Sequence, residues 1–216
     1  MKEIKVYGIR KSGTRYLTNI IQNNVDNDLY NVEEAGTTSK FGWKHGKPQY
    51  FEDAYYVFII RGLEEWLSSM WSNPLIGYEP TWKGSNNFKD FVTSSFTLEE
   101  GKTPQPPYHF RNIFELYYYK INWYLKFFDG HQNCAVIKLE PLRKDHFLVK
   151  TILESFQIIP TTQFEDVIID TNSKEFGVRT RKSDYKLTKS DKNLIKKFKI
   201  NRFERRLANL SCLIHI

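Results

Sequence analysis

Val6-Tyr-Gly-Ile-Arg-Lys-Ser-Gly-Thr-Arg-Tyr-Leu17 is the stretch that decides the fold. The apolar run over 4–7, which enters this stretch, is typical of a strand. The residues from Gly8 to Gly13 then form a basic loop. A helical pattern follows from residue 14, with apolar side chains on one face. A strand, a glycine-bounded loop and a helix make a cradle in which backbone N–H groups and the helix N-terminus point at one anion. The stretch therefore predicts an anion-binding site.

The loop differs from that of a nucleoside triphosphatase in what surrounds its second glycine. Thr14-Arg15 follows Gly13, where a Walker A loop has lysine and then a hydroxyl residue. The lysine lies earlier, at Lys11, so the hydroxyl that would hold magnesium has no lysine before it. The pattern argues against a P-loop nucleotide kinase or NTPase, which stays open as an alternative.

Composition and charge set broader limits. The chain has 216 residues, of which 40% are hydrophobic, and this predicts one domain over 1–216 with one core. Its net charge is +7, which favours anionic partners such as nucleotides, nucleic acid, acidic glycans or membrane surfaces. A basic nucleic-acid-binding module is therefore a second alternative, although nothing in the sequence requires nucleic acid as a partner.

The cysteines and the N-terminus bear on the compartment. Cys134 and Cys212 have no metal-like spacing and form no disulfide framework, and Cys134 opens an apolar run typical of a reduced core residue. The sequence contains no signal peptide and no run of about 18 apolar residues. We therefore expect a cytoplasmic protein without a membrane span.

Strand and helix patterns alternate along the chain. Strands are predicted over 4–7, 29–32, 54–60 and 135–139. Helices are predicted over 14–24, 63–71, 88–95, 113–128, 147–156 and 190–207. The alternation predicts an α/β domain with a central, mostly parallel sheet flanked by helices, with its ligand at the carboxyl ends of the strands. Residues 73–107 are rich in Pro, Gly, Ser and Trp, and we interpret them as a substrate loop or lid, the alternative being a surface insertion.

A second anion site is predicted where the buried run over 54–60 ends in Arg61. A nucleoside triphosphatase usually places an acidic residue at such a strand end. Arg61 can instead fork onto a phosphate, and serines on the following helix can add a hydroxyl donor. The alternative is an ion pair of Arg61 with Glu64 or Glu65. Together with the first loop, Arg61 favours a ligand that carries two separate anionic groups.

These stretches resemble a known family. Arg10-Lys-Ser-Gly-Thr-Arg-Tyr-Leu17 resembles the 5′-phosphosulfate loop of the sulfotransferases that use PAPS, 3′-phosphoadenosine 5′-phosphosulfate. Ile59-Ile-Arg-Gly-Leu-Glu-Glu-Trp-Leu-Ser-Ser69 resembles their 3′-phosphate motif. Val136-Ile-Lys-Leu-Glu-Pro-Leu142 and Leu153-Glu-Ser-Phe-Gln-Ile158 resemble later, less specific elements in the expected order. The resemblance implies a P-loop-like sulfotransferase architecture, PAPS as donor, adenosine 3′,5′-bisphosphate as product, and no metal.

Roles follow from the resemblance residue by residue. The 5′-phosphosulfate would be held by Arg10, Lys11, Ser12, Gly13, Thr14 and Arg15. Lys11 would also stabilise charge on the bridging oxygen, and Tyr16 would stack on adenine. The 3′-phosphate would be bound by Arg61 and Ser69, with Ser68 as the alternate. A late basic motif of the family corresponds to Arg181 and Lys182, with Arg179 as a competitor.

The reaction that the resemblance implies is an in-line displacement at sulfur, with an acceptor hydroxyl of a carbohydrate or small molecule as the nucleophile. Fixed cations and N–H donors stabilise such a transition state without a metal. A base that takes the acceptor proton contributes about 10²–10⁴-fold. Lys44-His45, followed by Pro48, resembles the Lys-x-His-x-Pro segment of cytosolic sulfotransferases, which implies His45 as base. Some glycan sulfotransferases use a glutamate, so Glu33 or Glu34 is the rival.

Overall fold

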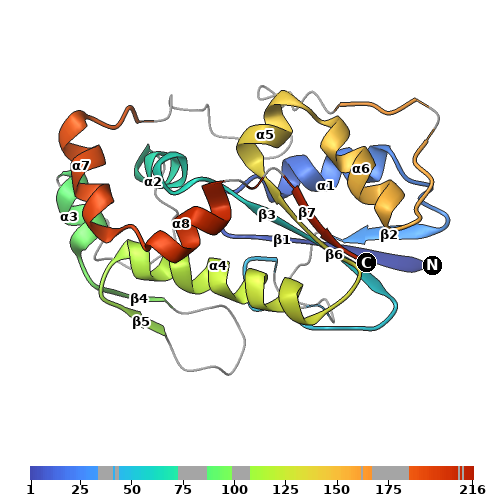
Figure 1. The fold of residues 1–216 in the computed structure, drawn as a ribbon, viewed down its shortest axis with the longest axis horizontal. Helices are drawn as coiled ribbons and strands as arrows, with labels where there is room; N and C mark the ends of the chain where they lie inside the picture. The colour runs from blue at the N-terminus through green and yellow to red at the C-terminus, as the bar shows by residue number, and fades with distance from the viewer. Residues whose placement is uncertain are drawn as a thin grey trace. The chain divides into compact units, whose positions relative to one another are not determined.

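Figure 1 shows the fold in a computed structural model. The structure describes residues 1–33, 41, 44–72, 87–98, 108–161, 163–166, 185–208, 210 and 212–216. These residues divide into two compact units. The first unit comprises Met1–Gly62, Lys120–Ile168 and Arg206–Ile216, and the second comprises Leu63–Tyr119 and Ile169–Arg205. The single domain predicted over 1–216 stays a prediction.

The first unit is built on a five-stranded sheet with the strand order β2-β1-β3-β6-β7. Its strands are β1 (Lys2–Gly8), β2 (Tyr30–Glu33), β3 (Ala54–Ile60), β6 (Cys134–Lys138) and β7 (Cys212–His215). All of these strands are parallel except β7, which pairs antiparallel with β6. The prediction of an α/β fold with a mostly parallel central sheet is confirmed. β7 has no counterpart among the predicted strands, because three half-buried residues and one exposed residue carry little periodic signal.

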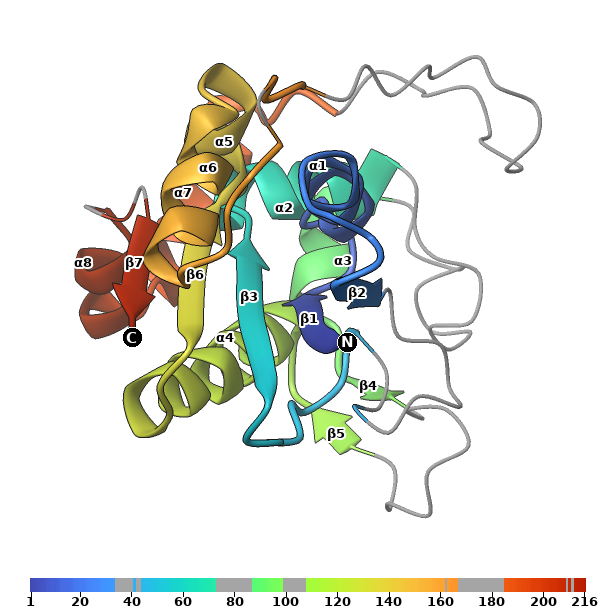
Figure 2. The same ribbon diagram turned by 90° about the vertical axis from the view of Figure 1, so that its right-hand side faces the viewer.

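Helices cover both faces of this sheet, as Figure 2 shows. One face carries α1 (Thr14–Asn23), α5 (Leu139–Lys144) and α6 (Phe147–Ser155), and the other carries the later turns of α4 (Ile113–Gly130). All seven residues of β3 are buried for this reason. Burial on both faces favours the continuous apolar run from which the strand was predicted.

The two faces of β3 enter different cores. Val57 and Ile59 belong to the aliphatic core with α1 and α6. Phe58 points the other way and lies against rings of α4, with centroid distances of 5.4 Å to Tyr124 and 5.5 Å to Phe127. Burying each such side chain contributes about 1.5–3 kcal/mol, so both helical layers hold the sheet firmly.

The register of the sheet brings the carboxyl ends of three strands to one edge. Gly8 of β1 pairs with Ile59 of β3, and Ile60 of β3 pairs with Lys138 of β6. The loops that follow these three strands therefore start side by side, where open α/β sheets bind their ligands.

The second unit contains most of the remaining elements. They are α2 (Leu63–Ser72), α3 (Phe88–Thr93), β4 (Phe96–Leu98), β5 (Tyr108–Phe110), the first turns of α4, α7 (Lys189–Phe198) and the start of α8 (Asn201–Ala208). The single helix predicted over 190–207 is wrong, since α7 and α8 are separate. The Tyr118 hydroxyl accepts a hydrogen bond from the backbone N–H of Ile200 at 3.1 Å, which satisfies that donor outside a helix.

Two further expectations meet the structure here. Of the segment 73–107, the parts 73–86 and 99–107 lie outside the described residues, while α3 begins at an Asn87 cap whose side chain accepts from the Asp90 N–H at 2.9 Å. Cys134 is fully buried with a free thiol, as predicted. Among the described residues, no helix combines the length and the apolar character needed to cross a bilayer.

A candidate anion-binding site at the ends of three strands

The loop between β1 and α1 is packed so tightly that its first glycine admits no side chain. A Cβ on Gly8 would lie 2.4 Å from Ser12 Oγ and 2.6 Å from the carbonyl oxygen of Ile59. A Cβ on Gly13 would lie 2.7 Å from Leu139 Cδ1, at the end of β6. The loop is therefore held against the ends of β3 and β6, and these contacts fix the position of its backbone.

The backbone of this loop has the alternating form of an anion-binding nest. Lys11 and Gly13 have φ values of 67° and 92°, whereas Ser12 between them does not have a positive φ. This alternation turns successive N–H groups toward one side. α1 begins directly after it, with no side-chain cap and no acidic residue in its first turn. The positive end of its dipole is thus available to an anion.

Ser12 carries a second sign of a ligand. Its side chain is fully buried, and its Oγ has no hydrogen-bond partner within the part of the chain that the structure describes. A buried hydroxyl without a partner costs about 1–3 kcal/mol. An anion in the nest would supply the missing acceptor.

Arg61 lies beside this loop. It follows β3 directly, is only 6% exposed, and donates a hydrogen bond from Nη1 to the carbonyl oxygen of Lys11 at 3.3 Å. The two cationic motifs that the sequence predicted therefore adjoin in one unit. Glu64, one of the ion-pair partners considered for Arg61, pairs with Lys199 at 3.0 Å in the second unit.

An acidic residue that the sequence reading assigned no role lies at the end of the neighbouring strand. Glu140 lies in the first turn of α5, just after β6, and its carboxylate oxygens accept from the backbone N–H of Gly62 at 3.2 and 3.3 Å. The carboxylate thereby holds the backbone directly after Arg61. The sequence signal that could have identified Glu140 is its position in Leu139-Glu-Pro-Leu142, directly after a strand.

His45 also lies at this edge of the sheet. Its Nδ1 is 2.6 Å from the carbonyl oxygen of Gly8, and the Gly8 N–H donates to the carbonyl of Lys44 at 3.0 Å. Because a carbonyl only accepts, Nδ1 carries the proton and the lone pair is on Nε2. Burial, with the charges of Lys44, Arg10 and Lys120 adding to it, lowers the pKa of His45 to about 3. The ring is therefore neutral at physiological pH.

The rival base Glu33 has a different neighbour. Its Oε2 lies 3.7 Å from Nζ of Lys5, which pairs in register with it across β1 and β2 and is fully buried. Burial lowers the pKa of Lys5 to about 8, and the Glu33 charge opposes that shift. His45 thus contacts the phosphate-binding loop at Gly8. Glu33, by contrast, compensates the charge of the buried Lys5, three residues before that loop. Glu34 lies outside the described residues.

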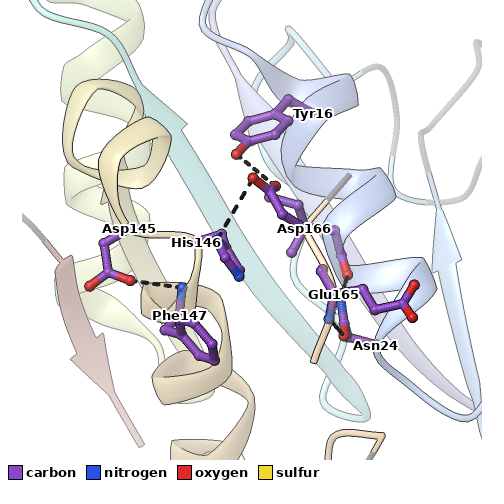
Figure 3. Close-up of polar contacts among 8 residues, drawn as sticks. Tyr16, Asn24, Asp145, His146, Phe147, Glu165 and Asp166 are labelled. Carbon is purple, nitrogen blue, oxygen red and sulfur yellow. Dashed lines mark hydrogen bonds and ion pairs between the residues drawn. The ribbon is translucent and has the colours of Figure 1, made fainter. Parts of the chain in front are cut away.

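Tyr16 projects from the first turns of α1 toward the segment 163–166, which we call the strap (Figure 3). Its hydroxyl donates to Asp166 Oδ1 at 3.0 Å, and Asp166 Oδ2 lies 3.7 Å from Nδ1 of His146. Burial and the hydrogen bond to Asp166 raise the pKa of Tyr16 to about 12. The ring is thereby held by its hydroxyl, and its stacking on adenine stays a prediction.

Asn24 fixes that strap, as Figure 3 also shows. Its side chain donates to the carbonyl of Glu165 at 2.8 Å and accepts from the Glu165 N–H at 2.7 Å. This pair of bonds places Asp166 beside α1. Neither Asn24 nor Asp166 was identified from the sequence, because the bond of Asn24 to Glu165 spans 141 positions and that of Asp166 to Tyr16 spans 150. No local pattern encodes such distant contacts.

The other predicted site residues divide by location. Within the loop, Arg10 is partly buried, Thr14 is buried and Arg15 is exposed. Ser68 and Ser69 belong to the second unit, where the Ser68 hydroxyl donates to the carbonyl of Tyr185. The phosphate roles of the two serines stay predictions.

The late basic motif of Arg181 and Lys182, together with its competitor Arg179, lies outside the described residues. Within the described residues, no group of three or more His, Cys, Asp or Glu side chains is arranged to hold a metal ion. Comparisons with models of protein families, with curated proteins and with solved structures found no match for this chain. The function is therefore inferred from the geometry of the site.

Proposed function

We propose that this chain is a PAPS-dependent sulfotransferase, which moves a sulfuryl group to the hydroxyl of a carbohydrate or small-molecule acceptor. The observation that carries the proposal is the hydrogen bond between Arg61 and the carbonyl of Lys11, with the Lys11 backbone in a left-handed conformation. It supports one site with two cationic parts, supplied by the ends of adjacent strands. PAPS has two separate anionic groups, so it matches such a site.

The residues of the loop fit the donor. The nest at Lys11 to Gly13, the uncapped start of α1 and the buried Ser12 hydroxyl suit the phosphosulfate end. The guanidinium of Arg61 suits a phosphate, because its planar fork matches two phosphate oxygens.

In the proposed reaction, the acceptor oxygen forms a bond to sulfur while the bond from sulfur to the 5′-phosphate oxygen breaks. Adenosine 3′,5′-bisphosphate leaves with the electron pair of that bond. Lys11 stabilises the charge on the departing oxygen, and Nε2 of His45 takes the acceptor proton. A bound anion would raise the low pKa of His45, because negative charge nearby favours the imidazolium.

Calorimetric titration tests the donor site directly. The wild type is expected to bind adenosine 3′,5′-bisphosphate much more tightly than 5′-AMP, with and without Mg²⁺. Arg61→Ala is expected to remove that preference, at a cost of about 10–100-fold in affinity for the bisphosphate, since a hydrogen bond to a charged group contributes about 1.5–3 kcal/mol. Arg206→Ala is the matched control, because Arg206 pairs with Asp129 and has no role in the site. Equal affinity of the wild type for both nucleotides contradicts the proposal.

A P-loop kinase or NTPase is the second candidate, and Glu140 is the observation that favours it. A carboxylate at the end of a strand next to the phosphate loop can organise magnesium. Here it accepts hydrogen bonds from the Gly62 N–H, which would compete with that role. Magnesium-dependent ATP binding that is lost in Glu140→Gln, together with no preference for the bisphosphate, would select this candidate.

A further inference from the structure

Lys120 is a buried lysine at the site that the proposed reaction does not use. It lies in α4, is 3% exposed, and donates from Nζ to the carbonyl oxygen of His45 at 3.1 Å. The ring of Trp123, one turn later, lies under the side-chain amino group with its centroid 4.2 Å from Nζ. Burying an ammonium is costly, so a position of this kind needs a reason beyond packing.

The contacts of Lys120 complete a closed set around His45. The Gly8 N–H bonds to Lys44, and the His45 ring bonds to the carbonyl of Gly8. Lys120 donates a hydrogen bond to the backbone carbonyl of His45 itself. The backbone is thus fixed on both sides of the imidazole, and the ring is fixed through Nδ1. In this tautomer the lone pair of the imidazole is on Nε2.

We propose that Lys120 is a positioning residue, which holds the backbone of His45 so that the imidazole keeps its proton on Nδ1 and presents the Nε2 lone pair. The catalytic part of this inference rests on the proposed function, whereas the orientation and tautomer of the ring do not. α4, on one face of the sheet, thereby sets the geometry of the segment before β3 that carries His45.

The charges around these two groups act in the same direction. Arg10 from the phosphate loop acts on both Lys120 and His45, and Lys44 acts on His45. Burial, and then the charge of Arg10, lowers the pKa of Lys120 to about 6. A bound anion would counter this local excess of positive charge, so Lys120 should hold His45 more firmly when the donor is present.

The test compares Lys120→Met, Lys120→Arg and a control, Lys126→Met, at an exposed lysine on the same helix. Long-range ¹H–¹⁵N spectra of the His45 ring report its tautomer without any turnover. In the wild type and in Lys126→Met we expect the single tautomer with Nδ1–H. In Lys120→Met we expect a mixture of tautomers, and in Lys120→Arg recovery of the single form, because arginine also donates to a carbonyl.

Turnover adds a second readout. Lys120→Met is expected to lower kcat by about 10²-fold, as a misplaced catalytic group does, with KM for PAPS unchanged. If Lys120→Met does not fold, Lys120→Leu replaces it, since leucine also removes the donor to the His45 carbonyl. A Lys120→Met or Lys120→Leu protein that keeps the single tautomer and the wild-type kcat overturns the inference. A tautomer change in a protein without PAPS turnover would uphold the positioning role and reject the proposed function.

Discussion

Arg61 donates from Nη1 to the carbonyl oxygen of Lys11 at 3.3 Å, a bond between residues 50 positions apart at the ends of adjacent strands. The bond joins two cationic motifs into one site before any ligand arrives. A site that is already arranged spends little binding free energy on ordering its groups. The loop geometry should therefore be sensitive to small changes in its packing.

Gly8→Ala should disrupt the loop. The new Cβ would meet the backbone carbonyl of Ile59 at 2.6 Å, which cannot move without shifting β3. We expect a loss of about 1–3 kcal/mol in the free energy of unfolding and weaker binding of the bisphosphate. Gly130→Ala is the control, because nothing lies within 4 Å of its added Cβ. Urea denaturation of both variants checks the prediction, and equal stabilities contradict it.

Lys11→Gly should separate folding from catalysis. Lys11 has a φ of 67°, which costs a non-glycine residue about 1–2 kcal/mol, so glycine relieves strain while removing the cation. We expect a protein at least as stable as the wild type that no longer turns over PAPS. Thermal unfolding and a sulfuryl-transfer assay measure the two effects. Wild-type turnover by this variant would exclude Lys11 from the chemistry.

His45→Asn should remove the base and keep the local structure. The asparagine amide can donate to the carbonyl of Gly8 in place of Nδ1–H, but it has no basic lone pair. We expect kcat to fall by about 10²–10⁴-fold with little change in stability. A variant that keeps its kcat shows that another group takes the proton.

Glu33→Gln should have the opposite effect. The substitution leaves the buried ammonium of Lys5 without its charge partner at 3.7 Å. Because Glu33 itself is partly exposed, we expect a loss of roughly 1–3 kcal/mol in the free energy of unfolding, with kcat unchanged. Chemical denaturation and the transfer assay, run on the same preparation, check both parts. A large loss of kcat at unchanged stability would make Glu33 the base.

Stability should depend on pH through Lys120. Its pKa is about 6 in the folded chain and near its ordinary value of 10.5 in the unfolded chain. Between these values the unfolded state binds more protons, so the free energy of unfolding falls as pH decreases from about 10 toward 6. Lys120→Met should flatten this part of the profile, whereas Lys126→Met should keep it. Urea denaturation at several pH values within this window measures the difference, and parallel profiles for the wild type and Lys120→Met contradict the assignment.

Local patterns in the sequence were enough for the framework of the site. The strand, loop and helix around Gly8 and Gly13 were predicted because glycine spacing and apolar periodicity are local signals. The run over 54–60 predicted a strand buried on both faces, and its last residue placed Arg61 at the carboxyl edge of the sheet. Parallel pairing then makes strand ends meet, whatever the loops contain.

Lys120 is a site residue that the sequence could have indicated, because it lies in an apolar helical stripe. Lys120 shares a helical stripe with Tyr117, Ile121 and Tyr124, all of them buried. A lysine in such a stripe indicates a buried cation with a specific partner. The partner itself, the carbonyl of His45, is 75 positions away and could not be inferred from the stripe.

The tertiary structure alone decided which side chains share the site. It put His45 on the carbonyl of Gly8 and Glu33 on Lys5, contacts that no local pattern encodes. It also took Tyr16 to Asp166, 150 positions away. Periodicity and glycine spacing report the conformation of a segment, whereas these pairings depend on how layers pack across the sheet, and that packing is set by the whole chain at once.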